Sequence, residues 1–263
     1  MNRIDKKFVE LKSNRRKGFI AYITAGDPSL KVTEKLIPAL ESAGVDILEL
    51  GVPFSDPMAD GTVIQRASER AIESKTTLKK ILLLVSKLRR KVNIPVVLFT
   101  YMNPVFRYGW ERFAKDAKKS GIDGVLVLDL PVEESKNERN LLLKNGIKMI
   151  YLIAPTSTDT RIKLISRKAS GFVYYVSRTG VTGVRDSVSH DVGPMVSRIK
   201  RFTDLPVAVG FGISKKEHVK EVARFSDAVV VGSAMVSKIE KNMKSKKMVP
   251  VVSDFVRNLK GEI

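Results

Sequence analysis

Short runs of Val, Ile and Leu recur along the whole chain, and each run is followed by a charged segment with helical spacing. The runs are almost continuously apolar, which is typical of parallel strands that are covered by helices on one side and packed on the other. The eight predicted strands are 19–24, 46–50, 95–101, 124–128, 148–153, 172–176, 206–209 and 227–231.

The segments between these runs have the pattern of amphipathic helices. After the first run, Val32 and Leu36 begin a series of apolar residues that fall three or four apart. We expect the Asp27–Pro28 pair to open this helix and Gly44 to close it. The alternation of strand and helix therefore continues from one end of the chain to the other.

Eight strand–helix units with no break in composition predict one (β/α)8 TIM-barrel domain over residues 1–263, in the α/β class. Residues 1–17 are predicted to form an extra N-terminal helix that packs on the barrel and covers its lower end. The alternative architecture is a doubly wound open sheet. That fold binds dinucleotides through Gly-x-Gly-x-x-Gly after the first strand, where this chain has Gly26-Asp27-Pro28 instead.

Composition narrows the function further. A chain of 263 residues that is 43% hydrophobic can bury a full core. It contains no cysteine and only two histidines, so we predict no disulfide, no cysteine nucleophile and no metal site. The first ten residues are charged and lead into no long apolar segment, so we expect no signal peptide, no membrane span and a soluble, cytoplasmic protein.

The charge balance is strongly positive, since 47 Lys and Arg against 28 Asp and Glu leave +19 at pH 7. Such a field attracts phosphorylated substrates, nucleic acid and acidic partner surfaces alike. The basic residues are spread over most helical segments without interleaved aromatic residues, which favours a diffuse solvated surface over a nucleic-acid face.

The second apolar run contains a carboxylate, Glu49. Its burial as an unpaired charge would cost roughly several kcal/mol. We therefore interpret Glu49 as a placed acid or base. Asp60 follows in the next loop, and the two groups could divide acid and base work. Asp60 also precedes a predicted helix at 63–72, and taken alone it is better explained as an N-cap. Asp56 could simply form a turn before Pro57.

Glycine-bearing turns follow the last three strands, at 180–183, 210–212 and 232–233. Backbone N–H groups at such turns, together with a helix N-terminus, form an anion-binding cup at the C-terminal face of many barrels. The alternative is that they are ordinary strand-to-helix turns. Tyr174, at the end of strand six, is either a core aromatic or a group whose hydroxyl reaches the rim. His190 and His218 are predicted to lie on loop or helix surfaces.

These motifs occur in one collinear order between residue 18 and about residue 233. They are ELGVPFSDP at 49–57, ADG at 59–61, DLPVEE at 129–134, IAPT at 153–156, Tyr174, GVTG at 180–183, GFGI at 210–213 and GS at 232–233. Together they resemble the tryptophan synthase alpha chain. The segment around Glu49 and Asp60 is specific to that family, whereas the glycine turns recur in many phosphate-binding barrels.

The resemblance implies a lyase of tryptophan biosynthesis, which cleaves indole-3-glycerol phosphate to indole and glyceraldehyde 3-phosphate in a retro-aldol reaction. It also implies a (β/α)8 barrel and an alpha2beta2 heterotetramer with the tryptophan synthase beta chain. The beta chain uses pyridoxal phosphate, and no cofactor is expected in the alpha chain. The rival reading is another phosphate-sugar barrel enzyme, an isomerase or epimerase, which would share the anion cup and differ in its acid and base residues.

By the same resemblance, Glu49 would shuttle protons, Asp60 would accept a hydrogen bond from the indole N–H, and Tyr174 would hold the region near Glu49. The other implied site residues are Gly183, Gly212, Gly232 and Ser233 for the substrate phosphate, and Tyr22, Ile64, Phe99, Leu126 and Phe211 for the indole pocket.

Two loops, 53–60 and 179–189, lack apolar anchors in the sequence, and we expect them to close over bound substrate. Contact between Asp56 and Thr182 would latch them. The chain departs from the family at position 22, where Tyr replaces the usual Phe, and in its unusually basic charge.

Overall fold

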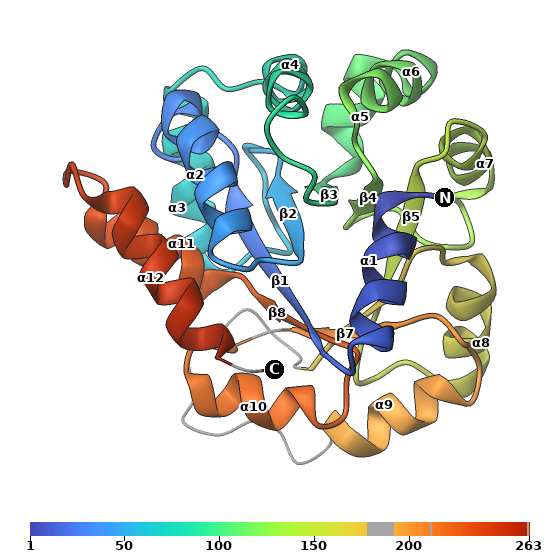
Figure 1. Cartoon of the computed structure of the whole chain (residues 1–263). Helices are drawn as coiled ribbons and strands as arrows, with labels where there is room; N and C mark the ends of the chain where they lie inside the picture. The colour runs from blue at the N-terminus through green and yellow to red at the C-terminus, as the bar shows by residue number, and fades with distance from the viewer. Residues whose placement is uncertain (178–191, 211, 262) are drawn as a thin grey trace.

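Eight parallel strands form a closed barrel in the computed structural model, which describes residues 1–177, 192–210, 212–261 and 263. Each strand pairs with its neighbours in sequence and β8 pairs back to β1, so the TIM-barrel prediction is confirmed (Figure 1). All eight strands begin and end within one residue of the predicted bounds. They are β1 (Gly18–Thr24), β2 (Ile47–Gly51), β3 (Val96–Thr100), β4 (Gly124–Val127), β5 (Lys148–Ile153), β6 (Val173–Val176), β7 (Val207–Gly210) and β8 (Ala228–Val231).

Helices surround the barrel and connect its strands (Figure 1). The described helices are α1 (Arg3–Ser13), α2 (Leu30–Ser42), α3 (Thr62–Glu73), α4 (Leu78–Leu88), α5 (Met102–Tyr108), α6 (Trp110–Ser120), α7 (Lys136–Lys144), α8 (Asp159–Lys168), α9 (Val192–Lys200), α10 (Lys216–Ala223), α11 (Ser233–Asn242) and α12 (Met248–Lys260).

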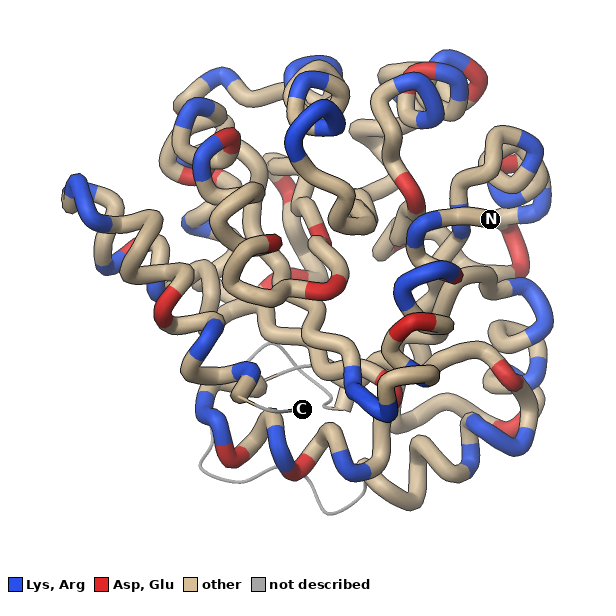
Figure 2. The backbone as a smooth tube through the Cα atoms, viewed as in Figure 1, with Lys and Arg blue, Asp and Glu red and all other residues tan. Residues whose placement is uncertain are grey.

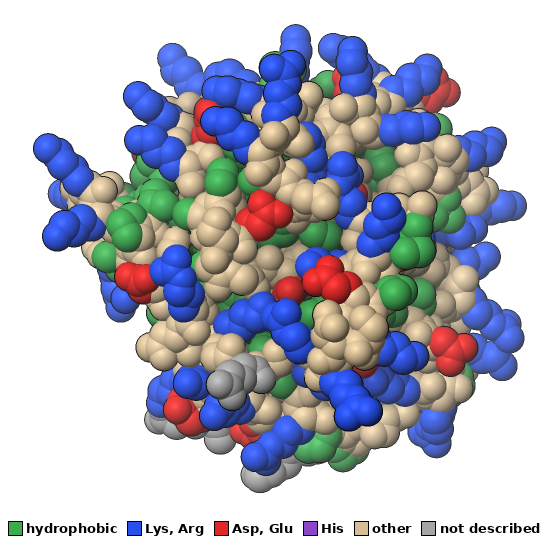
Figure 3. Space-filling view, viewed as in Figure 1, with side chains coloured by type: hydrophobic (Ala, Val, Ile, Leu, Met, Phe, Trp, Pro, Cys, Tyr) green, Lys and Arg blue, Asp and Glu red, His purple; other side chains and the backbone are tan. Residues whose placement is uncertain are grey.

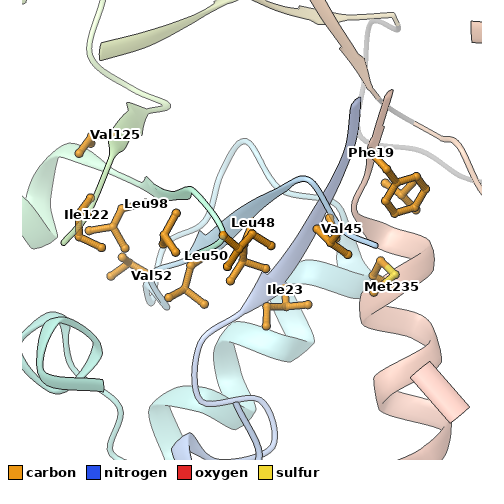
Figure 4. Close-up of a cluster of buried hydrophobic side chains, with 14 of the residues drawn as sticks. Phe19, Ile23, Val45, Leu48, Leu50, Val52, Leu98, Ile122, Val125 and Met235 are labelled. Atoms are coloured by element: carbon orange, nitrogen blue, oxygen red, sulfur yellow. The ribbon is translucent and has the colours of Figure 1, made fainter. Parts of the chain in front are cut away.

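The apolar runs divide their side chains between two cores, because successive residues of a strand face opposite sides of the sheet. One set packs outward against the helices, and Figure 4 shows part of this outer cluster, with Leu48 and Leu50 of β2 near Leu98 of β3. The other set fills the barrel. It includes Ile20, Ile47, Val97, Leu126, Ile150, Phe172, Tyr174, Ala208, Ala228 and Val230.

Helix α1 adds its apolar face to the inner cluster through Ile4, Phe8 and Leu11. The Phe8 and Phe172 ring centroids are 5.8 Å apart. Gly124, the first residue of β4, lies against Ile4, so α1 packs at the end of the barrel where the strands begin. The opposite end, where the strands finish, is therefore the end left for a substrate.

Two local predictions need correction. Helix α2 begins at Leu30 because the Ser29 side chain accepts a hydrogen bond from the N–H of Val32, so Pro28 belongs to the preceding turn. Gly44 does follow the end of this helix, with a φ of +96°. The surface assignment of His218 is wrong, because α10 turns its apolar face to the barrel and buries that side chain to 4% exposure.

Lys and Arg positions are distributed over the outer helices (Figure 2), and basic side chains extend across the face seen in Figure 3, where they surround a few acidic groups. This distribution agrees with the predicted diffuse positive surface. Among the helices of the described residues, none has the length and apolar character that crossing a bilayer requires.

Candidate active site

Glu49 points into the barrel near the end where the strands finish. It lies in β2 two residues beyond Ile47, which belongs to the inner cluster, so both side chains face inward. Its side chain is 1% exposed, and its Oε1 has no hydrogen-bond partner. Burial raises the pKa of Glu49 to about 8, because the charged form loses its hydration. The group is therefore a neutral carboxylic acid at pH 7 and can donate a proton.

Asp60 is held differently. Its Oδ2 accepts a hydrogen bond from the Tyr101 hydroxyl at 3.0 Å, and the residue is 7% exposed. Burial raises the pKa of Asp60 to about 6, and the Tyr101 hydrogen bond opposes that rise. The N-cap interpretation is wrong, because Gly61 occupies the N-cap of α3 without a side-chain cap and the Asp60 carboxylate turns to Tyr101.

The two carboxyl groups thus differ in charge near neutral pH. Glu49 is protonated below about pH 8, and Asp60 is ionised above about pH 6. Environments that separate the pKa values of two acids in this way assign one the role of proton donor and the other that of a fixed negative charge. The site can therefore protonate a substrate and stabilise a cation.

Tyr174 belongs to the inner cluster and is 8% exposed. Burial and the charge of Glu49 hold the pKa of Tyr174 well above its usual range, so the hydroxyl stays protonated near Glu49. A Cβ at position 210 would lie 2.5 Å from the Tyr174 Oη. Gly210 is therefore needed for the close approach of the Tyr174 hydroxyl to β7.

An apolar wall lies beside the two carboxyl groups. Tyr22, Ile64 and Phe99 pack in one cluster, and the Tyr22 and Phe99 rings meet edge to face with centroids 5.2 Å apart. Leu126 lies in the inner cluster, against which Phe99 also packs. The structure thus brings four of the five predicted pocket residues together, while Phe211 lies outside the described residues.

The predicted phosphate turns after β7 and β8 lie at one edge of the barrel, because Gly210 pairs with Val230 in the parallel register. Gly212 has a φ of +76°. Gly232 is the N-cap of α11 and provides no side-chain cap, and its carbonyl accepts from the N–H groups of Met235 and Val236, so the N–H groups of Ser233 and Ala234 have no acceptor within the helix. Gly183 lies outside the described residues.

The loop 53–60 has an apolar anchor that the sequence analysis missed. Phe54 packs against Tyr101 with ring centroids 5.2 Å apart, so the expectation of a loop without such anchors is wrong. Asp56 is exposed and accepts a hydrogen bond from the Ser55 hydroxyl at 2.6 Å. Its proposed latch partner, Thr182, lies outside the described residues. Tyr101 is the last residue of the third predicted strand, 95–101. Active-site residues of parallel barrels lie at this end of the strands, so its position in the sequence could have identified Tyr101 as a site residue.

A second polar cluster supports the helix that carries Ile64. Arg70 of α3 pairs with Asp27 at 2.7 Å in the turn after β1 and with Glu240 of α11 at 2.8 Å. Arg66 adds a second ion pair to Glu240. The hydrogen bonds and charges of the two arginines lower the pKa of Glu240 to about 2. This cluster ties three elements around the site and was not visible in the sequence.

The described residues contain no group of three His, Asp or Glu side chains arranged to hold a metal ion.

Comparison with known proteins agrees with the geometry. The model of the tryptophan synthase alpha chain family matches residues 8–262. The chain is 50% identical to the tryptophan synthase alpha chain of Solibacter usitatus, covering 99% of this chain and 97% of that one. It is 46% identical to that of Thermoanaerobacter sp., with 99% of each chain covered.

Solved structures agree as well. The subunit alpha of tryptophan synthase from Legionella pneumophila superimposes with a TM-score of 0.89 at 38% identity, covering 99% of this chain and 97% of that one. A chain of the tryptophan synthase a2b2 complex from Pyrococcus furiosus gives a TM-score of 0.87 at 40% identity, with 93% and 98% covered.

Proposed function

Because this chain belongs to the tryptophan synthase alpha chain family, we propose that Glu49 and Asp60 are the groups that carry the family's reaction in it. The reaction is the retro-aldol cleavage of indole-3-glycerol phosphate to indole and glyceraldehyde 3-phosphate, a carbon–carbon lyase step of tryptophan biosynthesis. One observation carries the assignment. Glu49 is a buried, unpaired carboxyl group whose pKa is raised to about 8, at the open end of the barrel.

The chemistry requires a proton on indole C3 and the loss of a proton from the hydroxyl next to the bond that breaks. Neutral Glu49 donates its proton to C3, which leaves a cationic ring. The resulting carboxylate then removes the hydroxyl proton as the aldehyde forms. The electron pair of the broken carbon–carbon bond returns to the ring, and Glu49 ends protonated as it began.

Asp60 supports the cationic stage. Its ionised carboxylate accepts a hydrogen bond from the indole N–H and lies where positive charge develops, which lowers the barrier most effectively in a site that excludes water. The indole ring packs against Tyr22, Ile64 and Phe99. Tyr174 holds the region around Glu49.

The substrate phosphate binds to backbone N–H groups of Gly212, Gly232 and Ser233, with Gly183 completing the cup. The N-terminus of α11 adds its partial positive charge. Binding energy from the phosphate then orients the reacting carbon near Glu49. Closure of the two loops, latched by Asp56 and Thr182, would exclude water.

The chain works with a tryptophan synthase beta chain in an alpha2beta2 complex, as the Pyrococcus furiosus relative does. Pyridoxal phosphate belongs to the beta chain in this proposal, and the alpha reaction uses no cofactor. The consecutive order of all eight strands supports one folding domain over residues 1–263. The cytoplasmic location stays a prediction.

The test is indole release from indole-3-glycerol phosphate by the purified chain, alone and with a beta chain. We expect Glu49→Gln to abolish cleavage, because the amide keeps the shape and cannot give or take the proton. Asp60→Asn should lose most of the rate and still bind substrate. Indole release by Glu49→Gln at the wild-type rate would refute the proton shuttle.

A further inference from the structure

We propose that Tyr101 is a positioning residue that presets the Asp60 carboxylate for the indole N–H and joins the two ends of the loop 53–60. The proposal rests on the role of Asp60 given above and concerns a residue that is not among the predicted site residues.

The Tyr101 hydroxyl lies between two partners of the same loop end. The Ala59 N–H donates to its oxygen at 3.1 Å, and the hydroxyl is 3.0 Å from Asp60 Oδ2. A backbone N–H can only donate, so the hydroxyl accepts there and its single proton is directed to Asp60. Oδ2 therefore already accepts one hydrogen bond, whereas Oδ1 accepts none from the described residues and faces the substrate free of such a contact.

The ring of Tyr101 acts on the other end of the loop. It packs on Phe54 with a centroid distance of 5.2 Å and an interplanar angle of 35°. The residues between the two ends include Asp56 and Met58, which are exposed, Met58 to 89%. One side chain therefore contacts the start and the end of a loop whose middle faces solvent.

Tyr101 itself is firmly placed. It directly follows β3 and is the N-cap of α5, and it is 4% exposed. The N–H of the next residue, Met102, donates to Asp129 Oδ1 at 2.6 Å, just beyond β4. A functional group held by a rigid element and a second hydrogen bond keeps its geometry before substrate binds.

The electrostatic surroundings keep Tyr101 in its donor form. Burial and the charge of Asp60 raise the pKa of Tyr101. Tyr22 also has a raised pKa, because of its burial and the charge of Asp60, and it stays neutral. Within the parts of the chain that the structure describes, no cation pairs with the Asp60 carboxylate, so the hydrogen bond from Tyr101 is its main stabilising contact.

The test is Tyr101→Phe, which keeps the ring on Phe54 and removes only the hydroxyl. Loss of one hydrogen bond to a charged group predicts a decrease in kcat of about 10- to 100-fold with a small change in KM. The pKa of Asp60 should rise, so the acidic limb of the pH profile of kcat/KM should move above pH 6. The matched control is Tyr108→Phe, which removes a Tyr hydrogen bond to Asp116 of 2.7 Å outside the site.

Each outcome decides the question. A wild-type kcat in Tyr101→Phe would overturn the inference, and so would a lower kcat with an unmoved acidic limb, which marks a structural role only. A loss of the same size in Tyr108→Phe would do the same. A second variant, Phe54→Leu, should lower kcat while the limb stays in place. Normal indole release by Asp60→Asn would contradict the proposed function itself. If Asp60→Asn is inactive while Tyr101→Phe has the wild-type kcat, only the inference about Tyr101 is contradicted.

Discussion

Glu49 of β2 lies directly opposite Tyr22 of β1 in the parallel register, so the buried acid and an aromatic side chain of the pocket are neighbours on the inner face of the barrel. The pKa of Tyr22 lies far above its usual range, mainly because the side chain is buried and also because of the charges of Asp60 and Glu49. The phenol therefore lies near both carboxyl groups, which links the proton donor, the fixed negative charge and the apolar wall in one site.

The first prediction is a bell-shaped pH profile of kcat/KM. Activity requires ionised Asp60, so it falls as the pH drops through about 6, and it requires protonated Glu49, so it falls as the pH rises through about 8. Initial rates of indole release measured from about pH 5 to about pH 9.5 give both the acidic and the basic limb of the profile. A rate that stays constant over this range would contradict the roles assigned to both Asp60 and Glu49.

The second prediction concerns stability. The folded pKa of Glu49 is raised from 4.5 to about 8, so the folded state binds the extra proton and its stability falls as the pH rises through that window. Glu49→Gln lacks this loss and should be more stable than the wild type above pH 8, by on the order of a few kcal/mol. Urea unfolding at pH 5 and pH 9, approximately, measures the difference. Glu134→Gln, at an exposed position, keeps Glu49 and should lose stability with rising pH just as the wild type does.

A third prediction follows from the ion pairs of Arg70. Arg70→Met leaves the carboxylate of Asp27, which is 1% exposed, without its partner, and breaking such a buried pair costs about 3–5 kcal/mol. We expect a lower Tm and a weaker apparent affinity for substrate, because α3 carries Ile64. Arg257→Met is the control, since its pair with Asp254 is exposed. Equal Tm values for the two variants would contradict the structural role of Arg70.

The fourth prediction uses the close contact at Gly51. A Cβ at this position would lie 2.2 Å from the Tyr22 Oη, so Gly51→Ala should displace the phenol, lower kcat/KM and destabilise the fold by about 1–3 kcal/mol. Adding Tyr22→Phe removes the oxygen that collides and should restore part of the stability. Thermal unfolding of the two single variants and the double variant gives the coupling. Strict additivity would show that the contact is not the cause.

Much of the fold could be predicted from local pattern. Apolar runs such as 148–153 are both the sequence signal and the physical cause of buried parallel strands, so their bounds agree with the structure to within one residue. Glu49 could be identified as unusual because a carboxylate in an apolar run has a large cost wherever that run is buried.

Asp60 shows where local pattern misleads. The Asp-Gly-Thr sequence suggests a helix cap, whereas the carboxylate binds Tyr101, 41 residues away along the chain. A strong partner just beyond the neighbouring strand competes with a weak local cap, and the local sequence contains no information about that partner.

What the sequence by itself determined is which segments are buried strands, which are helices, and which carboxylate cannot be merely structural. Only the tertiary structure decided the partners of each polar group, such as Tyr101 with Asp60 and Arg70 with Asp27 and Glu240. The reason is geometric. Closing the sheet sets the register of all eight strands at once, and that register brings together side chains as distant in the chain as Arg70 and Glu240, which are 170 residues apart.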